Sequence, residues 1–115
     1  MAQTNLPICC KVRVTVYQPD FEGGHSFGKG VHLLLKGIQE TGSLNRTAKN
    51  MGMAYSRAWN ILKQCEKEIG ISFVERHGPK GSSLTKEGLE FMAMYEEMEK
   101  AAGQAVADVF CKYRK

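Results

Sequence analysis

The sequence predicts a mainly α-helical domain with one small β-hairpin, and three observations support this fold class. Apolar residues recur at helical spacing in four stretches: 31–41, 43–51, 54–69 and 85–115. The second and third stretches are joined by a tight turn at Gly52, which is the layout of a helix-turn-helix. Short strands at 73–74 and 83–84, on either side of a Gly/Pro-rich tip at 77–82, are predicted to form a β-hairpin. Together they predict a winged helix-turn-helix with a long C-terminal dimerisation helix.

The composition bounds the size and the class of the protein. Its 115 residues, 43% of them apolar, can build one small core but not two. We expect residues 1–10 to be disordered, 11–84 to form the winged helix-turn-helix domain and 85–115 to form the dimerisation helix. No stretch reaches the roughly 18 apolar residues of a membrane helix. The N-terminus also lacks the pattern of a signal peptide, so the predicted location is cytoplasmic.

Residues 11–17 alternate strictly between apolar and polar side chains, which predicts a half-buried β-strand. One strand is not stable alone, so it must pair with the wing, with another hairpin strand or with a second subunit. The segment 18–30 is rich in glycine and is expected to be a loop. It comes within one residue of a phosphate-binding loop, but Gly30 stands where a magnesium-binding Ser or Thr is required. We therefore interpret it as a flexible connection.

Local signals set the helix boundaries. Ser43 can cap the helix 43–51 and Thr85 can cap the last helix, because both side chains can accept a backbone N–H. Gly52 and Gly70 can end the two helices of the helix-turn-helix. The residues expected to face the core are Val31, Leu34, Leu35, Ile38, Leu44, Ala48, Met51, Ala58, Leu62, Cys65 and Ile69. His32 lies beside this set and is predicted to be a packing or surface residue.

Charge is concentrated around the helix-turn-helix. Residues 43–80 carry seven Lys/Arg and three Asp/Glu, a net charge of +4, whereas residues 1–42 carry +1 and residues 81–115 carry −1. A localised basic patch is typical of nucleic-acid binding. We therefore predict binding to double-stranded DNA. The predicted contact residues are Ser43, Arg46, Tyr55, Ser56, Arg57, Asn60, Lys63, Arg76, His77 and Lys80.

Some of these residues are expected to contact bases and others to contact phosphates. Arg57 and Asn60 are predicted to read guanine and adenine, respectively. The groups expected to bind phosphates are Ser56, Lys63, Arg46, Lys80 and the backbone N–H groups at the start of the helix that Ser43 caps. The wing residues Arg76, His77 and Lys80 would straddle the backbone or enter the minor groove. Tyr55 and Trp59 are either core aromatics or contacts to a sugar or a thymine methyl group.

The last helix, 85–115, would be about 30 residues and roughly 45 Å long. It is longer than one small domain can cover, so its apolar seam predicts a partner helix. A symmetric homodimer satisfies both seams with one surface. The predicted dimerisation residues are Phe91, Tyr95, Met98, Ala102, Ala105 and Val109.

Several motifs resemble the N-terminal domain of the molybdate-responsive transcriptional regulators, the ModE family. They are Glu40-Thr-Gly-Ser-Leu, Met51-Gly-Met-Ala-Tyr-Ser-Arg-Ala-Trp59, Phe73-Val-Glu-Arg76 and Leu84-Thr-x-x-Gly88. The LysR-type regulators share the broader Gly-Ser…Ala…Leu-Thr-x-x-Gly frame but not the Tyr-x-x-Ala-Trp segment. The resemblance covers about residues 11–110 and implies a dimeric winged helix-turn-helix that binds a near-palindromic operator.

Two departures from that family pattern limit what the resemblance implies. The family's glycine-rich wing is reduced to Gly-Pro-Lys-Gly-Ser-Ser, at 78–83. The family binds molybdate in a separate C-terminal domain, and the chain has no room for one after Lys115. We therefore expect DNA binding without molybdate sensing.

Other classes of function are less well supported by the residues. Neither paired carboxylates nor a nucleophile–base arrangement stands out, so no enzyme is predicted. The cysteines lack metal-ligand spacing, so neither a metal nor another cofactor is predicted. The alternative is a protein-interaction module on a winged scaffold without specific DNA binding. The regulatory signal is open between a ligand at the dimer seam, oxidation of Cys9 and Cys10, and a separate sensor protein.

Overall fold

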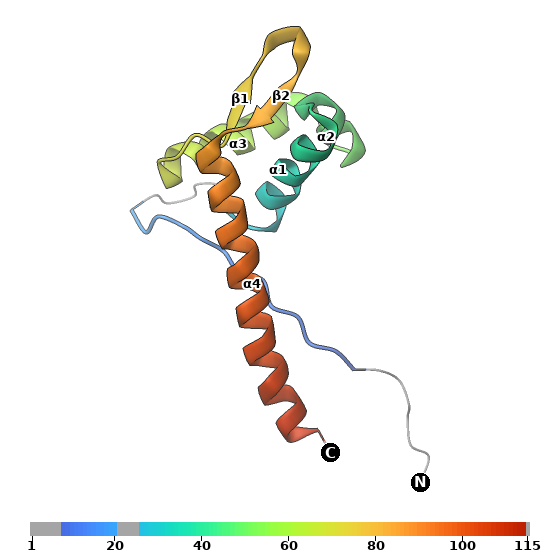
Figure 1. Cartoon of the computed structure of the whole chain (residues 1–115), viewed down its shortest axis with the longest axis vertical. Coiled ribbons are helices and arrows are strands. Elements are labelled where there is room, and N and C mark those ends of the chain that lie inside the picture. Colours follow the sequence, from blue (N-terminus) through green and yellow to red (C-terminus); the bar gives the residue numbers. More distant parts are fainter. Residues whose placement is uncertain (1–7, 21–25, 115) are drawn as a thin grey trace.

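The computed structural model describes residues 8–20 and 26–114 of the chain. Helices α1 (Lys29–Thr41), α2 (Leu44–Asn50) and α3 (Tyr55–Ile69) come first. The antiparallel strands β1 (Val74–Arg76) and β2 (Ser82–Leu84) form the wing, and α4 (Lys86–Tyr113) follows them (Figure 1). The predicted fold class, a mainly α-helical winged helix-turn-helix with a long C-terminal helix, is confirmed.

The helix boundaries arise from the predicted caps. Ser43 Oγ accepts the N–H of Arg46 at 3.0 Å, and Thr85 Oγ1 accepts the N–H of Gly88 at 2.8 Å. Gly52 leaves the helical region after α2 with φ 68°, and Gly70 does so after α3 with φ 85°. Left-handed backbone of this kind favours glycine, because other residues would strain their Cβ. Both caps and both glycine stops are therefore confirmed.

An aromatic cluster joins the segments that are distant in sequence. The ring of Phe27 is fully buried, and its centroid lies 5.4 Å from Phe73, 4.7 Å from Phe91 and 4.9 Å from Tyr95. Phe27 was expected to lie in a flexible loop, and that prediction was wrong. One apolar residue among glycines gives no periodic signal, so only the tertiary packing reveals it. The helix α1 also starts at Lys29, two residues before the predicted boundary, because Gly28 is its N-cap.

The predicted strand 11–17 forms only one bridge, between Val16 and Phe27. The alternation itself is confirmed, because the valines of this segment are half-buried and the residues between them are exposed. A regular strand is absent from this part of the described chain because its backbone bonds to side chains instead. Val14 O accepts the hydroxyl of Tyr95 at 2.9 Å, and Val14 N donates to Glu99 at 3.3 Å. Burial and the Glu99 carboxylate raise the pKa of Tyr95 to about 12.

Each wing strand has three residues, one more than predicted, and β1 begins one residue later than expected. Val74 pairs with Leu84 and Arg76 pairs with Ser82, whereas the expected strands were 73–74 and 83–84. A single 3-10 turn, Gly78–Lys80, forms the tip. The N–H of Ser82 also donates to Gly42 O at 2.8 Å. This bond ties the start of β2, next to the tip of the wing, to the end of α1.

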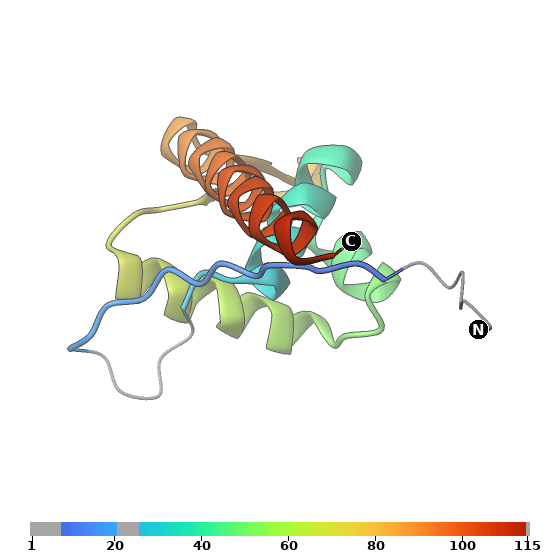
Figure 2. The same ribbon diagram turned by 90° about the horizontal axis from the view of Figure 1, so that it is seen from below.

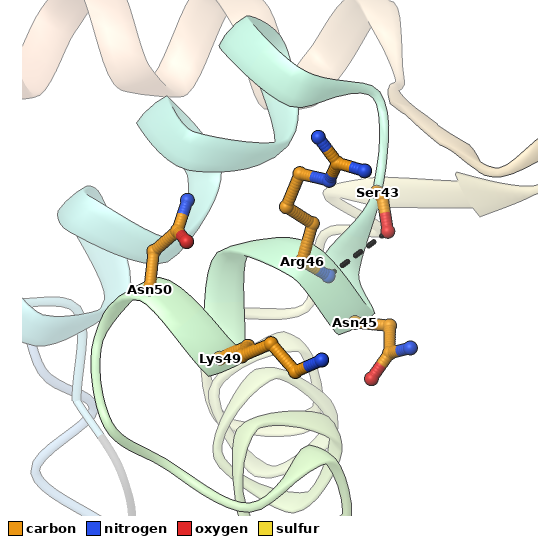
Figure 3. A pocket seen from close by; sticks show the side chains of 5 residues that line it. All are labelled: Ser43, Asn45, Arg46, Lys49 and Asn50. Carbon is orange, nitrogen blue, oxygen red and sulfur yellow. Dashed lines mark hydrogen bonds between the residues drawn. The ribbon is translucent and has the colours of Figure 1, made fainter.

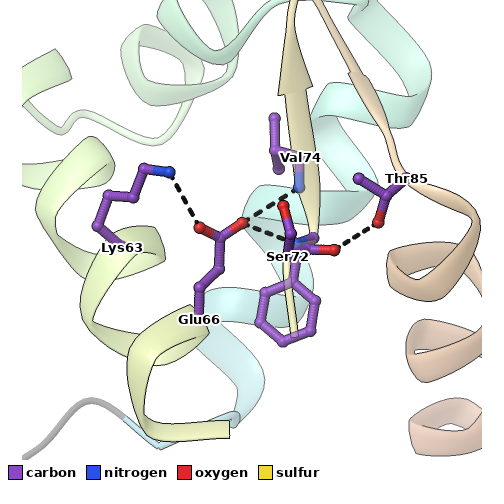
Figure 4. A network of polar contacts seen from close by, with 6 residues as sticks. Lys63, Glu66, Ser72, Val74 and Thr85 are labelled. Carbon is purple, nitrogen blue, oxygen red and sulfur yellow. Dashed lines mark hydrogen bonds and ion pairs between the residues drawn. The ribbon is translucent and has the colours of Figure 1, made fainter. Parts of the chain in front are cut away.

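The side chain of Glu66 holds the connection between α3 and β1. Its Oε2 accepts the N–H of Phe73 at 2.7 Å and that of Val74 at 3.2 Å (Figure 4). Its Oε1 accepts the ammonium of Lys63 at 3.2 Å. On the other side of this connection, Thr85 Oγ1 donates to Ser72 O at 2.5 Å. The start of the wing is therefore bonded to α3 and to the start of α4.

The helix α4 projects well beyond the rest of the molecule. The described chain measures 63 × 32 × 25 Å, and its radius of gyration of 17.6 Å exceeds the roughly 13 Å of a compact domain of this length. Phe91 and Tyr95 at its start are buried in the chain's own core, whereas Val109 is 56% exposed. Figures 1 and 2 show the free end of α4 with only the segment 8–20 crossing it. Two of the six predicted dimer contacts thus face inward.

A histidine links α1 to α4. His32 is buried, as the packing alternative requires, and its Nε2 lies 2.8 Å from Glu96 Oε2. This hydrogen bond, together with Lys36 at 3.7 Å, lowers the pKa of Glu96. The pair joins α1 to α4 next to the buried Tyr95.

Two of the earlier predictions depend on residues outside the described part of the chain. The expected disorder of 1–10 concerns mainly residues 1–7, and the phosphate-loop lookalike includes residues 23–25. Within the described residues, Lys29 and Gly30 form the first turn of α1. Across those same residues, no helix is both long enough and apolar enough to span a membrane.

Replacing Gly88 by alanine should destabilise the fold. The new Cβ would collide with the backbone of Phe73, which cannot rotate away. Overpacking of this kind lowers the free energy of unfolding by about 1–3 kcal/mol. The matched control is Gly103→Ala on the same helix, where nothing lies within 4 Å. It should raise stability by about 0.5–1 kcal/mol. Urea unfolding measures both, and equal effects would contradict the close packing of α4 on Phe73.

Replacing Glu66 by alanine should leave two N–H groups at the start of the wing without their acceptor. The expected loss in the free energy of unfolding is about 1–3 kcal/mol, and Glu66→Gln should lose less because its amide oxygen can still accept. Glu75→Ala is the control, because Glu75 is exposed on the same hairpin. It should change stability by less than about 0.5 kcal/mol. A loss as large for Glu75→Ala as for Glu66→Ala would refute this role.

Candidate nucleic-acid interface

The helix α3 has one buried side and one polar, exposed side. Ala58, Leu62 and Cys65 are buried against the core. Burial, with smaller effects of Glu68 and Glu66, raises the pKa of Cys65 to about 12, so its thiol is an uncharged packing group. The exposed side chains on the other side are Ser56, Arg57, Asn60, Lys63, Gln64 and Lys67. The predicted division of α3 into a core stripe and an outward stripe is therefore present in the structure.

The helix α2 adds a polar hollow of about 400 Å³ beside α3 (Figure 3). It is lined by Ser43, Asn45, Arg46, Lys49 and Asn50. Two of these residues, Ser43 and Arg46, belong to the predicted site, and the other three do not. A signal for the missing residues exists in the sequence. Asn45 and Lys49, like Arg46 and Asn50, are four residues apart and therefore share one face of a helix.

A second cleft, of about 210 Å³, brings three of the predicted residues together. Ser43 at the start of α2, Tyr55 at the start of α3 and Arg76 in the wing all line it. These residues lie on three different elements. The fold therefore gathers the starts of both helices of the helix-turn-helix and the wing around one groove.

The wing residues have different environments. Lys80 is exposed on the 3-10 turn at the tip. His77 Nε2 lies 2.7 Å from Ser83 Oγ, so this side chain bridges the two strands of the hairpin. Arg76 lies over the ring of Trp59, with 4.5 Å between its Cζ and the ring centroid. Lys80 alone of the three extends away from the hairpin without such a contact among the described residues.

The acidic residues of this region largely face inward. Glu68 is 4% exposed and accepts the N–H of Gln18 at 3.2 Å. Glu66 bonds to the backbone at the start of β1. Among the three acidic residues of 43–80, Glu75 is the exposed one. The exposed surface of α2, α3 and the wing is therefore more positive than the charge count of the segment indicates.

The described residues contain no group of three or more His, Cys, Asp and Glu side chains that could hold a metal ion. The chemistry of the site instead consists of amide, hydroxyl, guanidinium and ammonium groups. These are the groups that donate hydrogen bonds to phosphate oxygens and base edges.

The family comparison agrees with this geometry. Residues 33–89, about half of the chain, match the model of the bacterial regulatory helix-turn-helix proteins of the lysR family. The matched segment runs from α1 through the wing to the first turn of α4.

Two curated relatives are similar over part of the chain. It is 29% identical over 80 residues to the molybdenum transport protein ModE of Herbaspirillum seropedicae. It is 34% identical over 76 residues to the transcriptional regulator ModE of Haemophilus influenzae. These segments cover 66% and 63% of this chain, respectively, and 30% of each relative. The chain thus spans about a third of the length of the curated relatives it matches.

Solved structures share the fold. The CbnR DNA-binding domain in its DNA complex superposes with a TM-score of 0.59 at 19% identity, covering 73% of this chain and 95% of that chain. ArgP from Mycobacterium tuberculosis gives 0.54 at 20% identity, covering 70% of this chain and 30% of that one. At such identities the similarity concerns the fold alone. The family match shows that residues 33–89 of the chain form a bacterial regulatory helix-turn-helix domain of the lysR family.

Proposed function

We propose that the chain binds a specific site on double-stranded DNA as a homodimer and thereby regulates transcription. The observation that carries this proposal is the exposed polar side of α3, flanked by the cations of α2 and the wing. The acidic residues Glu66 and Glu68 of the same region face inward. Such a surface attracts the phosphate backbone and keeps base-reading side chains accessible.

In this proposal α3 enters the major groove, which is wide enough for one helix. Arg57 and Asn60 are exposed on its first two turns and would read guanine and adenine. Ser56 and Lys63 would contact phosphates on either side. Tyr55 is half-buried at the groove between the helices and the wing, so its exposed edge could meet a sugar or a thymine methyl group.

The first helix of the motif would cross the phosphate backbone. Ser43 and Arg46 were predicted contacts, and the polar hollow on α2 adds Asn45 and Lys49 to them. The wing would reach the neighbouring backbone or the minor groove through Lys80, with Arg76 and His77 behind it. A contact to the phosphate backbone of DNA sets the register of the protein on the duplex but carries no sequence information.

The exposed part of α4 supports the homodimer. Phe91 and Tyr95 are already buried, so the interface would lie along the part of the seam beyond them: Met98, Ala102, Ala105 and Val109. Pairing two copies along this seam would place two α3 helices on one side of the dimer. The proposed operator is therefore near-palindromic, and the cytoplasm, where chromosomal DNA is accessible in bacteria, is the proposed location.

The signal that controls binding is a separate part of the proposal. The names of the two relatives concern molybdenum transport and transcriptional regulation, and this chain matches 30% of each. We propose that the described domain binds DNA independently of molybdate.

Selection of bound duplexes from a random pool, with and without molybdate, tests this function. We expect enrichment of one two-fold symmetric site with half-sites about one helical turn apart, to the same degree in both arms. Failure to enrich any sequence would favour the protein-interaction alternative. Enrichment that depends on molybdate would overturn the proposed independence from it.

Replacing Asn60 by alanine should weaken binding to the selected site by about 1–3 kcal/mol and relax its specificity at one base pair. The reason is that an amide bidentate to adenine is lost, while phosphate contacts remain. Binding to the selected and to a scrambled duplex is measured by fluorescence anisotropy. An equal loss on both duplexes would contradict base reading by Asn60.

Replacing Lys80 by alanine should weaken binding to every duplex to a similar degree. One lost phosphate contact should also reduce the slope of log affinity against log salt by about 0.9. Titrations of both duplexes at several salt concentrations measure it. A loss confined to the selected duplex would show that Lys80 does not act as a phosphate contact.

A further inference from the structure

The tryptophan of the chain lies where α3 meets the wing, and two cations lie over its ring. The Cζ of Arg76, on β1, is 4.5 Å from the ring centroid of Trp59. The Nζ of Lys63, one turn further along α3, is 4.6 Å from the same centroid. Both distances fall within the roughly 6 Å range of cation–π attraction. One indole ring therefore contacts a cation of the helix and a cation of the wing.

We propose that Trp59 is a positioning residue for DNA binding. Its ring holds Arg76 and Lys63 at the junction of α3 and the wing, where both cations face the phosphate backbone of bound DNA. The inference rests on the proposed DNA-binding function. It adds a residue that touches neither a base nor a phosphate but determines where two phosphate contacts lie.

Both cations keep free hydrogen-bond donors in this arrangement. A guanidinium that stacks on a ring uses its face, so the five N–H donors in its plane remain available. Lys63 has three donors, and one of them bonds to Glu66 Oε1 at 3.2 Å. Both side chains are exposed. A phosphate oxygen can therefore reach each cation without breaking its contact with the ring.

Prior ordering of these side chains makes binding more favourable. A free Arg or Lys side chain samples many rotamers and loses that freedom when it grips a phosphate. Here the rings restrict the guanidinium before DNA arrives, because Tyr55 also lies under it, with its centroid 5.9 Å from Arg76 Cζ. Less entropy is then lost on binding.

The same contacts fix the wing relative to the recognition helix. The start of β1 is bonded to Glu66 on α3 through the N–H groups of Phe73 and Val74. The end of β1 is held to α3 through Arg76 and Trp59. A strand attached at both ends has a defined distance from the helix. The spacing between the wing cation and the base-reading face of α3 is therefore set in the free protein.

The test compares Trp59→Leu and Trp59→Phe in the full chain on the selected duplex, between about 50 and 200 mM salt. Leucine keeps apolar packing but has no ring, so both cations would lose their prior ordering, and we expect affinity to fall about 5-fold to 150-fold. The salt slope should become shallower by about one to two, since each phosphate contact contributes about 0.9. Phenylalanine keeps a ring and should retain most of the affinity and the slope.

The control for a purely structural effect is Ile61→Ala, because Ile61 is half-buried on the same helix and packs against the core. It should lower thermal stability at least as much as Trp59→Leu while the salt slope stays unchanged. A second measurement compares the salt slope of the double variant Arg76→Gln, Lys63→Gln with that of the triple variant that also carries Trp59→Leu. With both cations absent, the loss of the ring should have no further effect on the slope, because coupled residues are not additive.

The outcomes separate this inference from the function on which it rests. If the unmodified chain shows no salt-dependent binding to DNA, the proposed function fails. If the unmodified chain binds but Trp59→Leu leaves the slope as it is, the function stands and the positioning role is overturned. A shallower slope in Trp59→Leu that Ile61→Ala reproduces would also overturn it, because lost packing alone would then explain the change.

Discussion

The fold depends on the aromatic cluster around Phe27. Its ring contacts Phe73, Phe91 and Tyr95, which come from the entrance to the wing and from α4. Buried aromatic pairs of this size contribute both area and geometry to a small core. Phe27 also carries the bridge to Val16, so the same residue fixes the N-terminal segment. The wing and α4 are in this way attached to the helices that support them.

This attachment positions the surface that we propose binds DNA. The helix α3 contributes Glu66 to the start of β1, while Thr85 joins the same connection to α4. Because the acidic side chains Glu66 and Glu68 bond to backbone N–H groups, their charge is directed away from the outer face. The stability of the connection and the positive potential of the surface therefore have a common origin. Glu66 contributes to both, because its carboxylate accepts the N–H groups of Phe73 and Val74.

Much of the fold could be predicted because its signals are local. Ser43, Gly52, Gly70 and Thr85 act on the backbone within a few residues of themselves, and a periodic apolar stripe needs only a helix to align it. The site was predicted less completely. Sequence reasoning found the exposed polar stripe of α3 but not the hollow on α2, nor that Arg76 lies over Trp59. The regular strand predicted for 11–17 is wrong, because alternation indicates which side chains are buried but does not identify a pairing partner.

The sequence by itself determined the order of the helices, the helix ends set by Ser43, Gly52, Gly70 and Thr85, the place of the wing and the location of the basic region. These properties follow from caps, turns and charges that act over one or two turns of chain. Only the tertiary structure decided that Phe27 is central to the core, that Phe91 and Tyr95 face inward, and which carboxylates are hidden. Each of these depends on contacts between residues tens of positions apart. Such contacts are set by how whole elements pack, which no local pattern encodes.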